Sequence, residues 1–80
     1  MENKIAVVAI IVSDVNEVDK INDLLHGYGE YIIGRLGLPY REKDINVISV
    51  VMDAPTETIN ALSGKLGMIN GVTSKVLTTK

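Results

Sequence analysis

Two aliphatic stretches, Ile5–Val12 (IAVVAIIV) and Ile45–Met52 (INVISVVM), decide how this chain folds. The first is apolar at every position and rich in β-branched residues, and the second is interrupted only by Asn46 and Ser49. A continuous apolar run of this length is typical of a buried strand. We therefore expect both stretches to be strands at the centre of a sheet, the first covered on both faces.

A helical pattern follows the first stretch. Asp14 is placed to cap the start of a helix, and Glu17, three positions later, would complete a capping box. Gly27 is placed to end that helix in the left-handed conformation. Between these ends, aliphatic side chains recur at the spacing of an amphipathic helix, at Val18, Ile21, Leu24 and Leu25.

A second helical pattern follows the second stretch. We expect this helix to start within residues 53–56, with Pro55 in its first turn, and to end at Gly67. A weak internal echo links the two halves of the chain, INDLLHGYG at 21–29 and INALSGKLG at 59–67. The apolar stripe of the second helix consists of Ile59, Leu62 and Leu66.

Two shorter strands complete the pattern. The first is expected over Tyr31–Leu38, ended by Pro39 and followed by a polar hairpin loop at 40–44. After a turn at Asn70–Gly71, Val72–Thr79 alternates polar and apolar residues in the manner of an edge strand. The resulting βαββαβ order predicts one α+β domain over residues 1–80 with a ferredoxin-like fold. Its four-stranded antiparallel sheet would carry two helices on one face.

Two helices leave the other face of such a sheet uncovered, and here that face is apolar too. Leaving about eight aliphatic side chains in water would forfeit on the order of 10 kcal/mol. A small domain has only about 5–15 kcal/mol of net stability. We therefore predict a homodimer or a dimer of dimers, joined sheet to sheet or edge to edge. The alternate sets of the first stretch, all apolar, are Ile5, Val7, Ala9, Ile11 and Ala6, Val8, Ile10, Val12. Those of the second stretch, mostly aliphatic, are Ile45, Val47, Ser49, Val51 and Asn46, Ile48, Val50, Met52.

The composition excludes several classes of protein. A net charge of −2 and a pI near 5.2 argue against direct binding of nucleic acid, which needs a basic surface. The absence of cysteine rules out disulfides and thiol chemistry, and it suits the cytoplasm, where we expect this protein. The apolar run at 5–12 is too short to span a bilayer, and no signal-cleavage motif follows it, so we expect no membrane association.

The chain also lacks the residues that carry chemistry in other proteins of this topology. The two aliphatic stretches contain no aromatic residue on which RNA bases could stack. The loop after the first strand has neither the glycines nor the arginine of a phosphate-binding loop. His26, the single histidine, has no partner at metal-ligand spacing. We therefore expect no enzymatic activity, no cofactor and no metal site.

The distinctive side chains gather in one stretch, residues 26–41, HGYGEYIIGRLGLPYR. It holds every aromatic residue, both arginines, the only histidine and four of the seven glycines. Tyr and Arg are enriched at interfaces, and glycine inside a strand marks a bulge or a close approach. Packing between subunits is favoured over a small-molecule pocket, and the two coincide where a pocket lies between subunits. The candidate effector or interface residues are His26, Tyr28, Tyr31, Gly34, Arg35, Gly37, Tyr40 and Arg41.

The run HGYGEYIIGRLGLPYREKDINVISVVMDA, followed by ALSGKLG and GV, resembles the regulators of the iron-only hydrogenase system. The resemblance extends over nearly the whole chain and is most specific around residues 27–42. It implies an ACT-like, ferredoxin-like fold related to the C-terminal domain of nickel-responsive repressors. It also implies a regulatory, ligand-sensing or assembly role connected with the maturation or expression of that hydrogenase.

Departures from the wider relatives limit what the resemblance implies. Nickel-responsive repressors bind their metal with histidines of the second strand and a cysteine entering the third, and Arg35–Gly37 and Lys43–Ile45 offer no such ligands. ACT domains bind amino acids beside a glycine that the loop at 13–15 lacks. No ribbon-helix-helix pattern is present, so control of transcription would act through a partner.

Two hypotheses follow from the residues and the resemblance. The first is a non-enzymatic, oligomeric regulatory domain that binds a small effector or a partner protein at a subunit boundary near Tyr28–Arg41. The second is an assembly protein whose distinctive residues only pack the oligomer interface.

Overall fold

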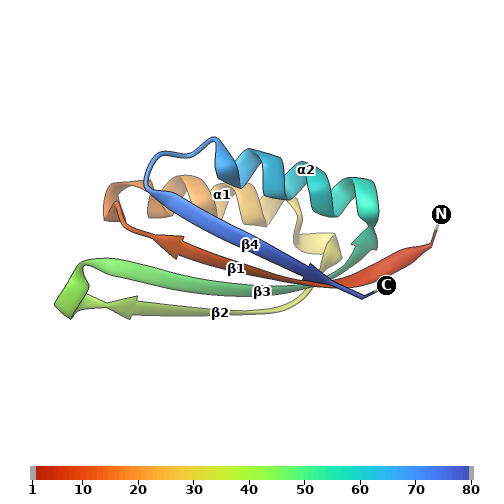
Figure 1. Ribbon diagram of the computed structural model, residues 1–80, viewed down its shortest axis with the longest axis horizontal. Helices are drawn as coiled ribbons and strands as arrows, with labels where there is room; N and C mark the ends of the chain where they lie inside the picture. Colours follow the sequence, from red (N-terminus) through yellow and green to blue (C-terminus); the bar gives the residue numbers. More distant parts are fainter. Residues whose placement is uncertain (1, 80) are drawn as a thin grey trace.

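The computed structural model describes residues 2–79, which form a four-stranded antiparallel sheet with two helices on one face (Figure 1). The strand order is β2-β3-β1-β4, so the two aliphatic stretches lie at the centre. This is the predicted α+β ferredoxin-like fold. The elements are β1 (Asn3–Val12), α1 (Val18–Gly27), β2 (Ile32–Tyr40), β3 (Ile45–Pro55), α2 (Thr56–Gly67) and β4 (Val72–Thr78).

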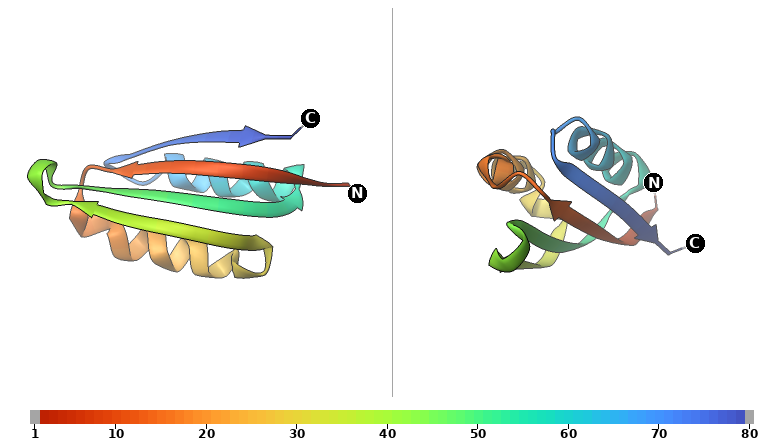
Figure 2. Two further views of the ribbon diagram at one scale, coloured as in Figure 1. Left: turned by 90° about the horizontal axis from the view of Figure 1, so that it is seen from below. Right: turned by 60° about the vertical axis from the view of Figure 1, so that its left-hand side comes forward.

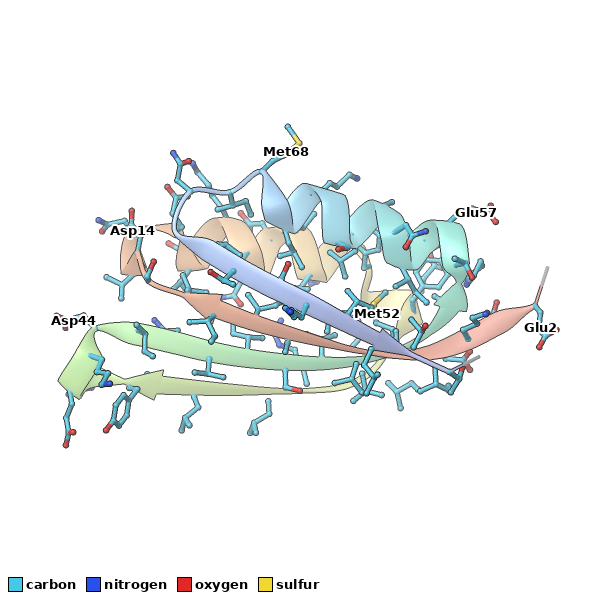
Figure 3. The ribbon with its side chains drawn as sticks, in the orientation of Figure 1. Glu2, Asp14, Asp44, Met52, Glu57 and Met68 are labelled. Atoms are coloured by element: carbon cyan, nitrogen blue, oxygen red, sulfur yellow. The ribbon has the colours of Figure 1, made fainter. Side chains whose placement is uncertain are left out.

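The core lies between the helices and one face of the sheet. Because successive side chains of a strand point to opposite faces, only alternate residues of β1 and β3 enter it. Met52 is one of them and lies between the sheet and the helices (Figure 3). The buried strand residues are Ala6, Val8, Ile10 and Val12 of β1 and Ile48, Val50, Met52 and Ala54 of β3.

The helices cover this face with the stripes that the sequence predicts. Ile21 and Leu25 of α1 are buried, and Val18 and Leu24 are partly buried against the same core. In α2 the buried residues are Ile59, Leu62 and Leu66. At about 1.5–3 kcal/mol for each large aliphatic side chain, these contacts fix both helices on one side of the sheet.

The start of α1 differs from the predicted capping box. Asp14 caps a short 3-10 helix at Val15–Glu17, where its Oδ1 accepts a hydrogen bond of 3.0 Å from the backbone N–H of Asn16. The carboxylate of Glu17 instead lies 3.1 Å from Nζ of Lys20. The extra 3-10 turn moves the start of α1 to Val18, so Asp14 and Glu17 do not pair as a capping box.

The end of α1 also differs from the prediction, because Gly27 is not left-handed. The backbone N–H of Tyr28 bonds the carbonyl of Leu25 at 3.0 Å, and a second 3-10 helix follows at Gly29–Tyr31. The chain therefore stays right-handed through this junction. Among the described residues, the left-handed conformation occurs at Asp44 and Gly71.

Neither proline has its predicted position. Pro39 lies within β2 instead of ending it, and an edge strand tolerates this because a proline there need not donate to the ladder. Pro55 lies at the end of β3 and precedes α2, whereas the sequence placed it in the first turn of that helix. The strand extends this far because it pairs with β1 as far as Asn3.

A tight turn connects α2 to β4. Gly71 has φ +74°, and its carbonyl accepts a hydrogen bond of 2.7 Å from the backbone N–H of Ser13. A Cβ at this position would lie 2.8 Å from Cβ of Asp14. The predicted turn at Asn70–Gly71 is thus confirmed, and both its conformation and its close contact require glycine.

The opposite face of the sheet has no covering element among residues 2–79. Figure 2 shows both helices behind the sheet in one view and above it in the other, with no segment on the other side. Within the protomer β1 is therefore covered on one face, and the cover expected on its second face would have to come from another copy of the chain. This uncovered surface is the prominent feature of the protomer.

Candidate functional site

The uncovered surface, here called the open sheet face, consists of the side chains that alternate with the core residues. Several large apolar side chains on it are solvent-exposed, with Ile11 at 45%, Leu36 at 67% and Leu77 at 73%. The register assigns to this face Ile5, Val7, Ala9 and Ile11 of β1, and Gly34, Leu36, Leu38 and Tyr40 of β2. It adds Ile45, Val47, Ser49, Val51 and Asp53 of β3, and Thr73, Lys75 and Leu77 of β4.

At the centre of the open sheet face two small side chains, one on each central strand, lie between larger ones. Ala9 of β1 is opposite Ser49 of β3, and Ser49 is opposite Leu36 of β2. On the two central strands the neighbouring rows are β-branched, with Val7 opposite Val51 on one side. Charged groups lie toward the margins, because Lys75 is on the edge strand β4 and Asp53 is near the end of β3.

The predicted site residues at the start of β2 have structural contacts. Tyr28 and Tyr31 are half-buried and pack against the core, and Nζ of Lys65 lies 5.3 Å from the centroid of the Tyr28 ring. This distance is within the range of a cation–π contact. His26 is exposed in the last turn of α1, where the helix dipole favours a cation.

The middle of β2 places its predicted residues on both faces of the sheet. Gly34 follows an irregularity in the register between Ile32 and Gly34, as predicted for a glycine at a bulge. Arg35 points to the helix side, where its guanidinium donates a hydrogen bond of 2.7 Å to Oδ1 of Asn22 in α1. Gly37 has open space where a Cβ would be, so no backbone approaches it in the protomer.

The far end of β2 carries the remaining predicted residues. The hydroxyl of Tyr40 donates a hydrogen bond of 2.9 Å to Oε2 of Glu42, and its ring belongs to the open sheet face. Arg41 is exposed in a short 3-10 helix, Arg41–Lys43, that connects β2 to β3. The left-handed Asp44 then turns the chain into β3.

A single protomer therefore does not gather the predicted residues into one pocket. The nine residues of β2 separate the Tyr31 end from the Arg41 end, a distance of roughly 30 Å along an extended strand. Half of these residues belong to β2, which forms one margin of the open sheet face, and the other half belong to the segments that precede and follow this strand.

The sequence reasoning missed three exposed apolar residues of this face, Leu36, Leu38 and Leu77. The first two alternate with the unusual side chains of residues 26–41, and the third lies in the edge strand expected at 72–79. The alternation of Leu36, Leu38 and Tyr40 along β2 was the available signal, because a period of two places all three on one face.

Three other properties of residues 2–79 bear on the function. No three His, Cys, Asp or Glu side chains come together in this part of the chain as a group that could hold a metal. No pocket opens on its surface. None of its helices has the length and apolar character needed to cross a membrane.

Comparison with solved structures finds a protein that is similar over almost the whole of both chains. The uncharacterized protein TM1266 from Thermotoga maritima is 38% identical, with a TM-score of 0.93, over 99% of this chain and 100% of that chain. A formyltetrahydrofolate deformylase from Pseudomonas putida KT2440 is 15% identical, with a TM-score of 0.60, over 92% of this chain and 28% of that chain. This second likeness shows the fold alone. Comparison with curated proteins finds no match.

The family assignment comes from residues 4–76, which cover the whole sheet except its outermost positions. They match the family model described as "TM1266-like: Iron-only hydrogenase system regulator, putative". The matched region includes all of β2 and β3, and all of β1 except Asn3. The chain therefore belongs to the TM1266-like family of iron-only hydrogenase system regulators.

Proposed function

We propose that this chain is a non-enzymatic regulatory domain of the iron-only hydrogenase system that works as an oligomer. It binds a small effector or a partner protein at the boundary between copies, along β2. The observation that carries this proposal is the open sheet face, whose exposed apolar area is too extensive to be left in water. The family description supplies the hydrogenase system as its context.

The position of β2 supports a binding site at the subunit boundary. Because β2 is an edge strand, a second copy that covers the sheet would end near it. Gly34 and Tyr40 of this strand face the open side, whereas Arg35 and Gly37 face the helix side. A ligand at this margin could therefore contact polar and aromatic groups of one copy and apolar groups of the other, a mixture typical of small-molecule sites.

A ligand screen with two arginine variants tests the proposal. Amino acids, nucleotides and divalent metals are compared by thermal shift and then by calorimetry. A ligand present at 100 times its dissociation constant stabilises the native state by about 2.7 kcal/mol. In a domain of this size we expect a rise in Tm of roughly 10 °C or more. We expect Arg35→Ala or Arg41→Ala to abolish the shift without dissociating the oligomer.

An assembly role without a ligand is the second candidate, and it is suggested by contacts within the protomer that account for several of the predicted site residues without a ligand. Tyr28 and Tyr31 pack on the core and Arg35 bonds Asn22, so these residues already have structural tasks. This candidate predicts a screen without hits and arginine variants that dissociate. The two outcomes separate a sensor from a scaffold.

A further inference from the structure

We infer that a second copy of this chain docks face to face on the open sheet face, with β3 of one copy over β1 of the other. The inference rests on the proposed function and deepens it, because it names the surface through which the oligomer forms. In Figure 2 neither helix lies over this side of the sheet.

The accessible area of the protomer fits a partner of this size. The chain exposes 5354 Å², which exceeds by about 650 Å² the roughly 4,700 Å² typical of a folded monomer of 8.7 kDa. Four strands about 4.8 Å apart and about eight residues long present a flat area of roughly 500 Å². A stable interface buries about 800 Å² on each partner, including its rim. Docking of one copy would therefore bury about as much surface as the protomer exposes in excess of a typical monomer.

The edges of the sheet are less suited to pairing than its face. The edge strand β2 has an irregular register next to Gly34 and contains Pro39, which lacks an N–H group. The other edge strand, β4, carries Lys75. Bulges, prolines and lysines are among the features with which natural sheets prevent pairing at their edges. The open sheet face has no comparable protection over its two central strands.

The register of the central strands makes this face complementary to itself. Ala9 is opposite Ser49, and Ile11 is opposite Val47. A two-fold axis parallel to the strands places β3 over the partner's β1 and thereby brings side chains of similar size together. The small row at Ala9 and Ser49 lets the two sheets approach closely, and aligned sheets then cross at about −30°.

Charge distinguishes this orientation from the alternative. With the axis parallel to the strands, Lys75 lies over the partner's Leu36, because these residues are at opposite ends of the same row. The aliphatic part of a lysine covers apolar surface well. In the alternative, the two-fold axis lies parallel to the sheet but runs across the strands, along this row. The strand β4 would then lie over β4 of the partner, and Lys75 would oppose the partner's Lys75. Like charges brought together in this way disfavour association.

A pair of lysine substitutions tests which surface associates. Ile11 is in the open sheet face, whereas Met68 is 85% exposed and points away from the sheet beyond α2 (Figure 3). We expect Ile11→Lys to raise the dissociation constant more than about 100-fold, because each dimer would bury two unpaired ammonium groups. The matched control Met68→Lys should sediment as the wild type does.

The outcomes separate this inference from the proposed function. If Ile11→Lys keeps the wild-type oligomer, docking on this face is refuted while an oligomeric regulator remains. If the wild type itself is monomeric, both are refuted. Circular dichroism establishes that the variants fold, and Ile11→Thr, which introduces no charge, serves if Ile11→Lys does not fold. A folded Ile11→Thr protein should dissociate more readily than wild type, and unchanged affinity would overturn the inference.

Cross-linking tests the orientation, since the chain has no cysteine of its own. Ala9→Cys and Ser49→Cys proteins are refolded together and treated with a bis-maleimide spanning about 10 Å, the separation of packed sheets. We expect cross-linked dimers from the mixture at several times the yield from either protein alone. Met68→Cys should give none. A higher yield from Ser49→Cys alone would overturn the arrangement of β3 over β1.

Discussion

On the central strands both faces of the sheet are largely aliphatic, yet their surroundings are opposite. On β1, Ile10 is completely buried under the helices, whereas the neighbouring Ile11 is 45% exposed on the open sheet face. The difference arises from topology, because both crossover helices pack on the same side of the sheet. Apolar residues therefore occur both on the face that the helices of the same chain cover and on the face that we propose a second copy covers.

The comparison is tested most strongly by truncating the two neighbouring isoleucines. Ile10→Ala leaves a cavity in the core and should lower the free energy of unfolding by about 2–5 kcal/mol. Ile11→Ala should lower it less, and by an amount that depends on protein concentration, because that side chain is buried only on association. Urea titrations at several protein concentrations measure both effects. Equal, concentration-independent losses would contradict the distinction between the faces.

A hydroxyl group placed on either face of β3 gives a smaller effect. Val50 is fully buried, so Val50→Thr should lower stability by about 1–3 kcal/mol because the hydroxyl lacks a partner. Val47→Thr, on the open sheet face, should hardly change the stability of the isolated protomer but should weaken association. Thermal melts and sedimentation of the two variants measure these effects. If Val47→Thr destabilises the protomer as much as Val50→Thr, the open face is packed within one chain.

A substitution in the turn before β4 lies outside both faces and gives a reference value for the stability changes of the other variants. Gly71→Ala should cost about 1–2 kcal/mol, because the left-handed backbone is unfavourable for alanine, with a further loss from the contact with Asp14. Gly64→Ala is the matched control within α2, where a Cβ meets no atom within 4 Å. It should raise stability by up to about 1 kcal/mol. Chemical denaturation gives both values, and a neutral Gly71→Ala would contradict the tight turn.

The smallest effect on stability is expected for a residue of the edge strand β2. Arg35→Ala removes an exposed hydrogen bond to Asn22 and should lower protomer stability by less than about 1 kcal/mol. Arg35→Lys keeps the charge and is the control. A loss well above this value would mean that Arg35 holds α1 to β2, which would weaken its candidacy for binding an effector.

Much of the fold could be predicted because local patterns and topology agree. The aliphatic runs at 5–12 and 45–52 predicted the central strands, and the spacing of apolar residues predicted the buried face of each helix. The ends of helices and strands were harder to predict, as Pro39 and Gly27 illustrate. Each has a strong local preference, but the pairing of β2 with β3 and the 3-10 helix after α1 override it.

The candidate site was predictable only in part. Residue types drew attention to Tyr28, Arg35 and Tyr40, and all three belong to β2 or to the junction before it. Their separation to opposite ends and faces of the strand depends on register, which residue types alone do not specify. The leucines of the open sheet face could not be predicted as site residues from their type, because a leucine is equally compatible with a buried core position and with an exposed one.

Sedimentation of the wild-type protein at micromolar concentration tests the central claim most directly. Exposure of so many aliphatic side chains predicts a particle of at least twice the 8.7 kDa chain mass, with little monomer present. A stable, monodisperse species of a single chain mass would contradict the account, because the open sheet face would then remain in water without a partner.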